Sequence, residues 1–235
     1  MDVLGEALLD YQNGKYTEDI KTFSSLDEED SIPLPYLFRD FNQMPKLEQK
    51  ALELCKGRVL DIGAGAGSHS LFLQKKGLEV TALDSSPGAI NVCEQRGIKK
   101  TIVAEILNYE KYSYDTLLLL MNGIGIVGSL DYLESYLTHF KKLLSPNGQI
   151  LLDSSDLIYM FEQEDDGGYW VPDNGTYYGQ VQFQLSYKGE KGEPFHWLYI
   201  DFKTLKEHCE KVNFNCKLVS KGDHYDYLAK LTLRP

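Results

Sequence analysis

Apolar and polar residues along the chain follow two different rhythms. In the first 45 residues the clearest pattern is helical, over residues 2–12, where apolar side chains recur three or four positions apart. Residues 25–35 are acidic and contain prolines, which predicts a loop. We therefore expect residues 1–45 to form an N-terminal helical arm and residues 46–235 to form the main domain.

From residue 46 to residue 153, short apolar runs alternate with amphipathic helical patterns. The helices between the runs have recognisable ends, such as Ser86 and Pro87 at the start of one helix and Gly97 after its end. Continuous apolar strands that alternate with helices predict an α/β fold, a parallel sheet with helices on both faces. The runs predict strands at residues 58–62, 78–84, 100–105, 115–122 and 149–153.

The alternation stops after residue 153. Residues 176–201 have the pattern of two strands joined by a turn, and we interpret the surrounding region, 158–200, as a β-hairpin insert over the active site. A helix at 202–214 precedes two strands, at 215–220 and 224–234. Because only a short turn separates these strands, we expect them to pair antiparallel at the edge of the sheet.

The stretch VLDIGAGAG, residues 59–67, joins the first strand of this pattern to its helix. In an open α/β sheet, ligands bind outside the carboxyl ends of the strands, where this turn lies. The turn lacks the Gly-Lys-Ser/Thr ending of a phosphate-binding loop. It also departs from the dinucleotide pattern G-x-G-x-x-G, because Ser68 stands at the sixth position and the third glycine comes one residue early. A tight turn without any ligand is the structural alternative.

Two acids beside the turn favour an adenosine-containing ligand without a diphosphate. Asp84 ends the second strand, where a carboxylate accepts hydrogen bonds from ribose hydroxyls. Asp61 stands two positions before the first glycine, and a carboxylate there suits an ammonium group better than a pyrophosphate.

The segments VLDIGAGAG, VTALDSSPGAI and YDTLLLLMNGIG together resemble the successive motifs of the class I S-adenosylmethionine-dependent methyltransferases. The likeness spans roughly residues 57–155 and the last helix and two strands. It implies a Rossmann-like sheet of seven strands in the order 3-2-1-4-5-7-6, with strand 7 antiparallel. It also implies an enzyme that uses S-adenosyl-L-methionine as cofactor. An NAD-dependent oxidoreductase and a non-catalytic S-adenosylmethionine-binding protein remain as alternatives.

The resemblance implies roles for the residues of the glycine turn. Gly63, Gly65 and Gly67 would lie under the methionine part of the cofactor. Asp61 would face its ammonium group, and Asp84 would hold its ribose.

Further cofactor contacts follow from the same resemblance. Met121 and Asn122 would end the fourth strand beside the transferred methyl group. Arg39, in the arm, would meet the cofactor carboxylate, although a surface salt bridge is an equally good interpretation. The other residues expected at the cofactor are Ala64, Ser68, His69, Ser85, Ser86, Ala104, Glu105 and Ile106.

Three residues are our candidates for action on the methyl acceptor: Asn122, Asp156 and His196. Asp156 follows the fifth strand, where helix capping is the alternative role. His196 is a candidate base, and a surface or packed histidine is the commoner role for such a residue. The insert is rich in tyrosine and tryptophan, which suits a substrate lid that closes together with the arm, or else packing onto the sheet. A metal-dependent site would want an aspartate where Asn122 stands, so we expect no metal.

The composition and charge of the chain bear on the class of molecule that it binds. The net charge of −11 weighs against bulk nucleic-acid binding, and the fourth strand lacks the Asn/Asp-Pro-Pro-aromatic signature of nucleic-acid amino-methyltransferases. We therefore expect a small-molecule acceptor. The four cysteines have no metal-site spacing, and no apolar run approaches the ~20 residues of a membrane span, which predicts a cytoplasmic protein with reduced thiols. The sequence pattern does not indicate an oligomeric state.

Overall fold

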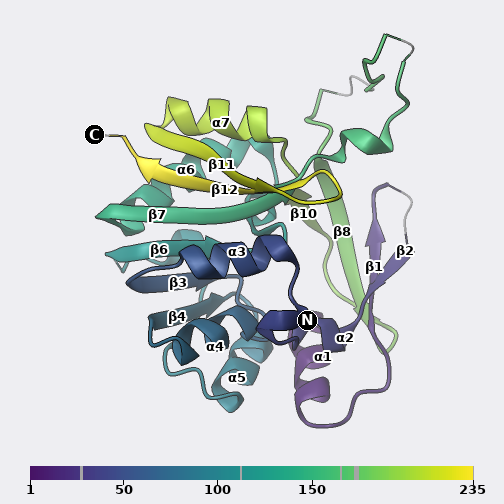
Figure 1. Cartoon of the computed structure of the whole chain (residues 1–235). Coiled ribbons are helices and arrows are strands. Elements are labelled where there is room, and N and C mark those ends of the chain that lie inside the picture. The colour runs from purple at the N-terminus through teal and green to yellow at the C-terminus, as the bar shows by residue number, and fades with distance from the viewer. Residues whose placement is uncertain (27–28, 112, 165, 172–174, 235) are drawn as a thin grey trace.

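The computed structural model describes residues 1–26, 29–111, 113–164, 166–171 and 175–234. Its main element is a seven-stranded sheet in the order β11-β12-β7-β6-β3-β4-β5 (Figure 1). Neighbours among β3 to β7 pair in parallel, and β12 is antiparallel to both β7 and β11. This confirms the predicted order, with β12 as the reversed seventh strand. The strands are β3 (Arg58–Ile62), β4 (Glu79–Asp84), β5 (Thr101–Val103), β6 (Tyr114–Leu119), β7 (Leu144–Ser155), β11 (Phe214–Lys221) and β12 (Asp226–Leu233).

Helices cover both faces of this sheet because its central strands are apolar on both sides. Leu117 and Leu119 of β6 share one core with α6, whereas Leu118 and Leu120 point the other way and share a second core with α3. The helices are α1 (Val3–Gln12), α2 (Leu34–Leu37), α3 (Lys46–Leu54), α4 (Ser68–Lys75), α5 (Pro87–Gln95), α6 (Leu133–Leu143) and α7 (Phe202–Lys211). Short 3-10 turns are η1 (Phe41–Gln43), η2 (Ile106–Asn108), η3 (Gly123–Val127), η4 (Leu130–Tyr132) and η5 (Leu157–Met160).

The arm is not purely helical, which corrects our expectation. A second sheet joins it to the insert in the order β10-β8-β1-β2, with β9 (Glu190–Lys191) paired to β8. The strands β1 (Ile20–Ser24) and β2 (Glu29–Ile32) come from the arm, and β8 (Gln180–Tyr187) and β10 (Phe195–Leu198) form the expected antiparallel hairpin of the insert. The predicted loop at 25–35 therefore contains β2. The pairing was invisible in the sequence because β1 finds its partner β8 far away along the chain.

The second sheet and α1 stand at the carboxyl edge of the main sheet (Figure 1). β10 contacts η3, the segment that follows the end of β6. α1 packs on α5 so closely that a Cβ on Gly5 would lie 2.7 Å from the Cα of Gly88. The side chain of Asp2 accepts hydrogen bonds from Ser86 Oγ and Gly88 N at the start of α5, both at 2.8 Å. The N-terminal end of the arm is thus fixed to α5.

Two strand boundaries differ from the prediction. β6 ends at Leu119 rather than at residue 122, because Met121 and Asn122 adopt left-handed backbone angles, with φ of 65° and 54°. β7 begins at Leu144, so residues 145–148, where we expected a turn, belong to the strand. No helix in the described ranges is long and apolar enough to cross a membrane.

Candidate active site

The glycine turn after β3 has the conformation that only glycine adopts without strain. Gly63, Gly65 and Gly67 have φ values of 75°, 53° and 79°. A Cβ at Gly63 or Gly65 would meet nothing within 4 Å, so both leave open space beside the backbone, as close approach of a ligand requires. Gly67 differs, because its Cβ would lie 2.3 Å from Ile98 Cδ1 and 2.9 Å from Cys93 Sγ. Close packing against these two side chains therefore also requires a glycine at Gly67.

Two buried carboxylates flank the turn, as the sequence predicted. Asp84 accepts hydrogen bonds from Gly65 N at 2.8 Å and Ser86 N at 2.9 Å, which ties the glycine turn to the end of β4. Asp61 accepts a hydrogen bond from Ser70 Oγ at 2.7 Å. Burial raises the pKa of both carboxyls, and hydrogen bonds to each oppose the rise. These acceptors suit the hydroxyls of a ribose and the ammonium of an amino acid.

Arg39 forms an ion pair that is buried, which corrects the surface salt bridge that we gave as the alternative. Its Nη2 lies 2.5 Å from both carboxylate oxygens of Glu48, and His69 Nε2 lies 2.8 Å from Glu48 Oε2. The Arg39 and Glu48 side chains are only 4% and 5% exposed. Burial works against ionisation of Glu48, but His69 and Arg39 hold its pKa below the usual range. Because Arg39 lies in the arm and His69 in α4, the cluster anchors the arm to the main domain.

Ser68 also serves the arm. Its Oγ donates to the carbonyl of Leu37, an arm residue, at 2.8 Å, whereas His69 contacts Glu48 of α3. Ser86 caps α5 through a bond from Ala89 N at 2.9 Å. The remaining predicted cofactor residues line the same edge: Ala64 is buried in the glycine turn, Ser85 is exposed after β4, Ala104 N donates to Asp84 O, Glu105 is exposed and Ile106 is buried.

A cavity of about 350 Å³ opens over the carboxyl ends of β6 and β7. The arm contributes Tyr36 and Pro45, and α3 contributes Leu47 and Glu48. The far wall is formed by the turn between β11 and β12 and by the start of β12. The residues there and at the strand ends are Met121, Asn122, Asp153, Ser155, His224 and Asp226.

Asp153 holds the strained turn that follows β6. Its carboxylate accepts hydrogen bonds from Met121 N at 3.1 Å and from Gly123 N at 3.2 Å. Burial raises the pKa of Asp153 to about 7. The charge of Glu48 also raises this pKa, whereas the two hydrogen bonds lower it. Asn122 lies between the two bonded residues, and its buried Oδ1 has no hydrogen-bond partner within the described residues.

The other two residues predicted to act on the acceptor do not line the cavity. Asp156 accepts hydrogen bonds from Ile158 N at 2.9 Å and Tyr178 Oη at 2.7 Å, so it caps η5 and fixes the insert. His196 is exposed on β10. Of our three candidates, the structure brings only Asn122 to the cavity.

Sequence reasoning missed Glu48 and Asp226. Glu48 had a detectable signal, because it shares the buried stripe of α3 with Leu47, Ala51 and Leu52, where a charged residue needs a partner. Asp226 had none, since it begins β12 and reaches the cavity only through the pairing of β12 with β7.

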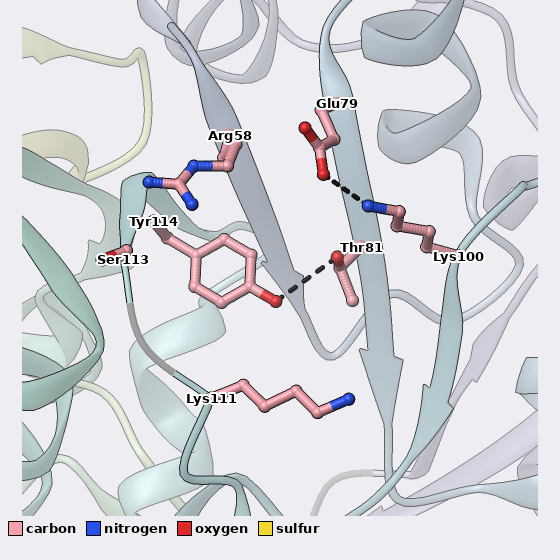
Figure 2. A pocket seen from close by; sticks show the side chains of 7 residues that line it. All are labelled: Arg58, Glu79, Thr81, Lys100, Lys111, Ser113 and Tyr114. Carbon is pink, nitrogen blue, oxygen red and sulfur yellow. Dashed lines mark hydrogen bonds and ion pairs between the residues drawn. The ribbon is translucent and has the colours of Figure 1, made fainter.

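A second hollow lies at the opposite edge of the sheet (Figure 2). Arg58 and Glu79 begin β3 and β4, and Lys100 forms an ion pair with Glu79. Tyr114, at the start of β6, donates a hydrogen bond to Thr81 (Figure 2). Since all parallel strands begin here, this hollow is remote from the glycine turn.

Comparison with known proteins identifies the family. A family model described as "Methyltransferase domain" matches residues 59–148. The solved structure of an S-adenosylmethionine-dependent methyltransferase from Bacteroides fragilis, in complex with S-adenosyl-L-homocysteine, is 42% identical, with a TM-score of 0.92 over 100% of this chain and 95% of that chain.

Two further matches are more distant. A ubiquinone biosynthesis O-methyltransferase from Xanthomonas oryzae is 27% identical over 110 residues, 44% of this chain and 45% of the relative, so the match spans less than half of that protein. The CcbJ methyltransferase from Streptomyces caelestis, 14% identical with a TM-score of 0.62 over 82% of this chain and 91% of that one, shares the fold. The chain therefore belongs to the S-adenosylmethionine-dependent methyltransferases of class I fold, and its cofactor is S-adenosyl-L-methionine.

Proposed function

We propose that the protein transfers a methyl group from S-adenosylmethionine to a small or medium-sized acceptor that binds in the cavity beside Asn122. The order of sites along the carboxyl edge of the sheet carries this proposal. Asp84 ends β4, Asp61 and Gly63 belong to β3 and its turn, Asn122 follows β6, and Asp153 lies near the end of β7. A cofactor with its ribose at Asp84 and its amino acid at Asp61 would then direct its methyl group toward the cavity.

When bound, S-adenosylmethionine supplies a methyl carbon that its positively charged sulfur already activates. The protein therefore has to bind, align and exclude water. Gly63 and Gly65 leave room for the ligand, and Asp61 and Asp84 accept its hydrogen bonds. The turn at Met121 presents Asn122 to the cavity in a fixed conformation.

The arm and the insert complete the enclosure in this proposal. Both stand at the carboxyl edge, and the pairing of β1 with β8 makes them one unit. Trp197 of β10 packs against Gly125 of η3, where a Cβ would lie 2.0 Å from the indole nitrogen. We propose that this unit closes over the acceptor as a lid, which would exclude water at the moment of transfer.

We also propose a small-molecule acceptor rather than nucleic acid, and a cytoplasmic location. The net charge of −11 supports the first. Four unpaired cysteines, Cys55, Cys93, Cys209 and Cys216, support the second.

The test is methyl transfer from labelled S-adenosylmethionine to a cell metabolite extract, with peptides and nucleic acids as parallel acceptors. Label in a small molecule supports the proposal. Binding of the cofactor without transfer to any of the three pools would instead indicate a non-catalytic S-adenosylmethionine-binding protein.

A further inference from the structure

The cavity beside Asn122 is rich in hydrogen-bond acceptors and poor in positive charge. None of the residues that line it, all within the described part of the chain, is a lysine or an arginine. Arg39 and His69 already balance Glu48, whereas Asp153 and Asp226 have no ion-pair partner within 4.0 Å among the described residues. A ligand with hydrogen-bond donors and a positive charge would complement this lining.

Asn122 gives an independent observation in the same place. Its Oδ1 is buried without a partner in the described chain, and an unpaired buried acceptor costs on the order of 1–3 kcal/mol. Asn122 has a left-handed backbone conformation, in the turn whose neighbouring N–H groups donate hydrogen bonds to Asp153. A donor from the ligand would satisfy it.

Resting on the methyl-transfer function proposed above, we propose that the methyl acceptor is an amine, and that Asp153 binds its ammonium group and accepts the proton that must leave before transfer. The ammonium would donate to the carboxylate of Asp153 and to Oδ1 of Asn122. A neutral hydroxyl would gain the hydrogen bonds but not the attraction between opposite charges.

The ammonium gives one proton to the Asp153 carboxylate and becomes a neutral amine. Its lone pair forms the new nitrogen–carbon bond while the carbon–sulfur bond breaks with its electron pair on sulfur. The product is a methylated ammonium, and Asp153 returns its proton to water.

The surroundings of Asp153 suit a group that exchanges a proton near neutral pH. The carboxyl is partly accessible from the cavity, and burial raises its pKa to about 7. The titratable groups that face it come from the arm, α3, α4, the turn between β11 and β12, and the start of β12. They are Tyr36, Glu48, His69, His224 and Asp226.

The test uses the full-length protein and pairs of acceptors that differ only in amine or hydroxyl, such as glucosamine and glucose, or benzylamine and benzyl alcohol, extended to a library of such pairs. We expect methyl transfer to amine members alone. Transfer to hydroxyl members alone would overturn this inference and leave the methyltransferase function intact. Failure of the protein to bind S-adenosyl-L-homocysteine would contradict the function itself.

For an amine that is methylated, kcat/KM of the wild type should fall as the pH drops through about 7, because Asp153 is then protonated. Asp153→Asn should lower kcat/KM about 100-fold at pH 7 and recover much of it at pH 9.5, where water deprotonates the amine. Its affinity for S-adenosyl-L-homocysteine should not change. The exposed Asp131→Asn is the matched control and should behave as the wild type.

Binding gives a readout that does not depend on turnover. In calorimetry on the protein saturated with S-adenosyl-L-homocysteine, Asp226→Asn and Asp153→Asn should each weaken binding of the amine at least tenfold. If Asp153→Asn lowers activity equally at all pH values and also weakens cofactor binding, Asp153 only supports the turn after β6 and the inference is wrong.

Discussion

The buried ion pair between Arg39 and Glu48 predicts a large loss of stability when one partner is neutralised. Glu48→Gln leaves the Arg39 guanidinium buried beside a neutral amide. Because the two side chains are 4% and 5% exposed, water cannot replace the lost charge. Loss of one member of such a pair costs about 3–5 kcal/mol, or about 6–20 °C in Tm for a protein of this size.

The assay is thermal unfolding of Glu48→Gln followed by circular dichroism. Glu29→Gln is the matched control, because the Lys21–Glu29 pair spans 3.8 Å with side chains 60% and 62% exposed, and Tm should be unchanged. The pKa of Glu48 is lowered in the folded state, so its contribution is present at neutral pH and is lost as the pH falls through that lowered pKa. The stability difference should therefore shrink in acid. A Tm for Glu48→Gln within about 2 °C of the wild type at pH 7 would refute the reasoning.

Two further predictions concern packing. In urea titration, Gly67→Ala should destabilise the fold by about 1–3 kcal/mol more than Gly97→Ala. Both residues have a positive φ, but only at Gly67 would the new Cβ lie 2.3 Å from Ile98 Cδ1. Equal losses of stability in the two variants would contradict this. Trp197→Ala should lower kcat/KM for the acceptor at least tenfold and leave the dissociation constant of S-adenosyl-L-homocysteine unchanged. The exposed Phe195→Ala is the control. Unchanged acceptor kinetics in Trp197→Ala would show that Trp197 only packs the insert.

The sequence predicted the main sheet because its signals are local. Apolar runs, capping residues such as Ser86 and glycines with positive φ each act within a few positions of the chain. The hairpin of the insert was predicted, but its pairing with the arm was missed because β1 finds its partner β8 far away along the chain. Strand order followed from the resemblance, not from periodicity.

The residues of the candidate site also differ in whether local sequence fixes their positions. Asp61, Gly63, Gly65 and Asp84 could be predicted because one strand–turn–helix unit and the next strand fix their places. The buried ion pair of Arg39 could not be predicted, because it depends on Glu48, which lies in α3. His196 and Asp156 were chosen by residue type, and their orientation on β10 and η5 decides that they lie elsewhere.

Calorimetric binding of S-adenosyl-L-homocysteine tests the central claim most directly, because it does not require the acceptor. Gly65→Arg should abolish binding, since the side chain would fill the open space beside the turn. Gly77→Arg, at the other end of α4, is the matched control with a positive φ of 87° and equally open surroundings, and it should bind as the wild type does. Binding that is equally strong in Gly65→Arg, or a wild-type protein that binds NAD and not S-adenosyl-L-homocysteine, would contradict the account.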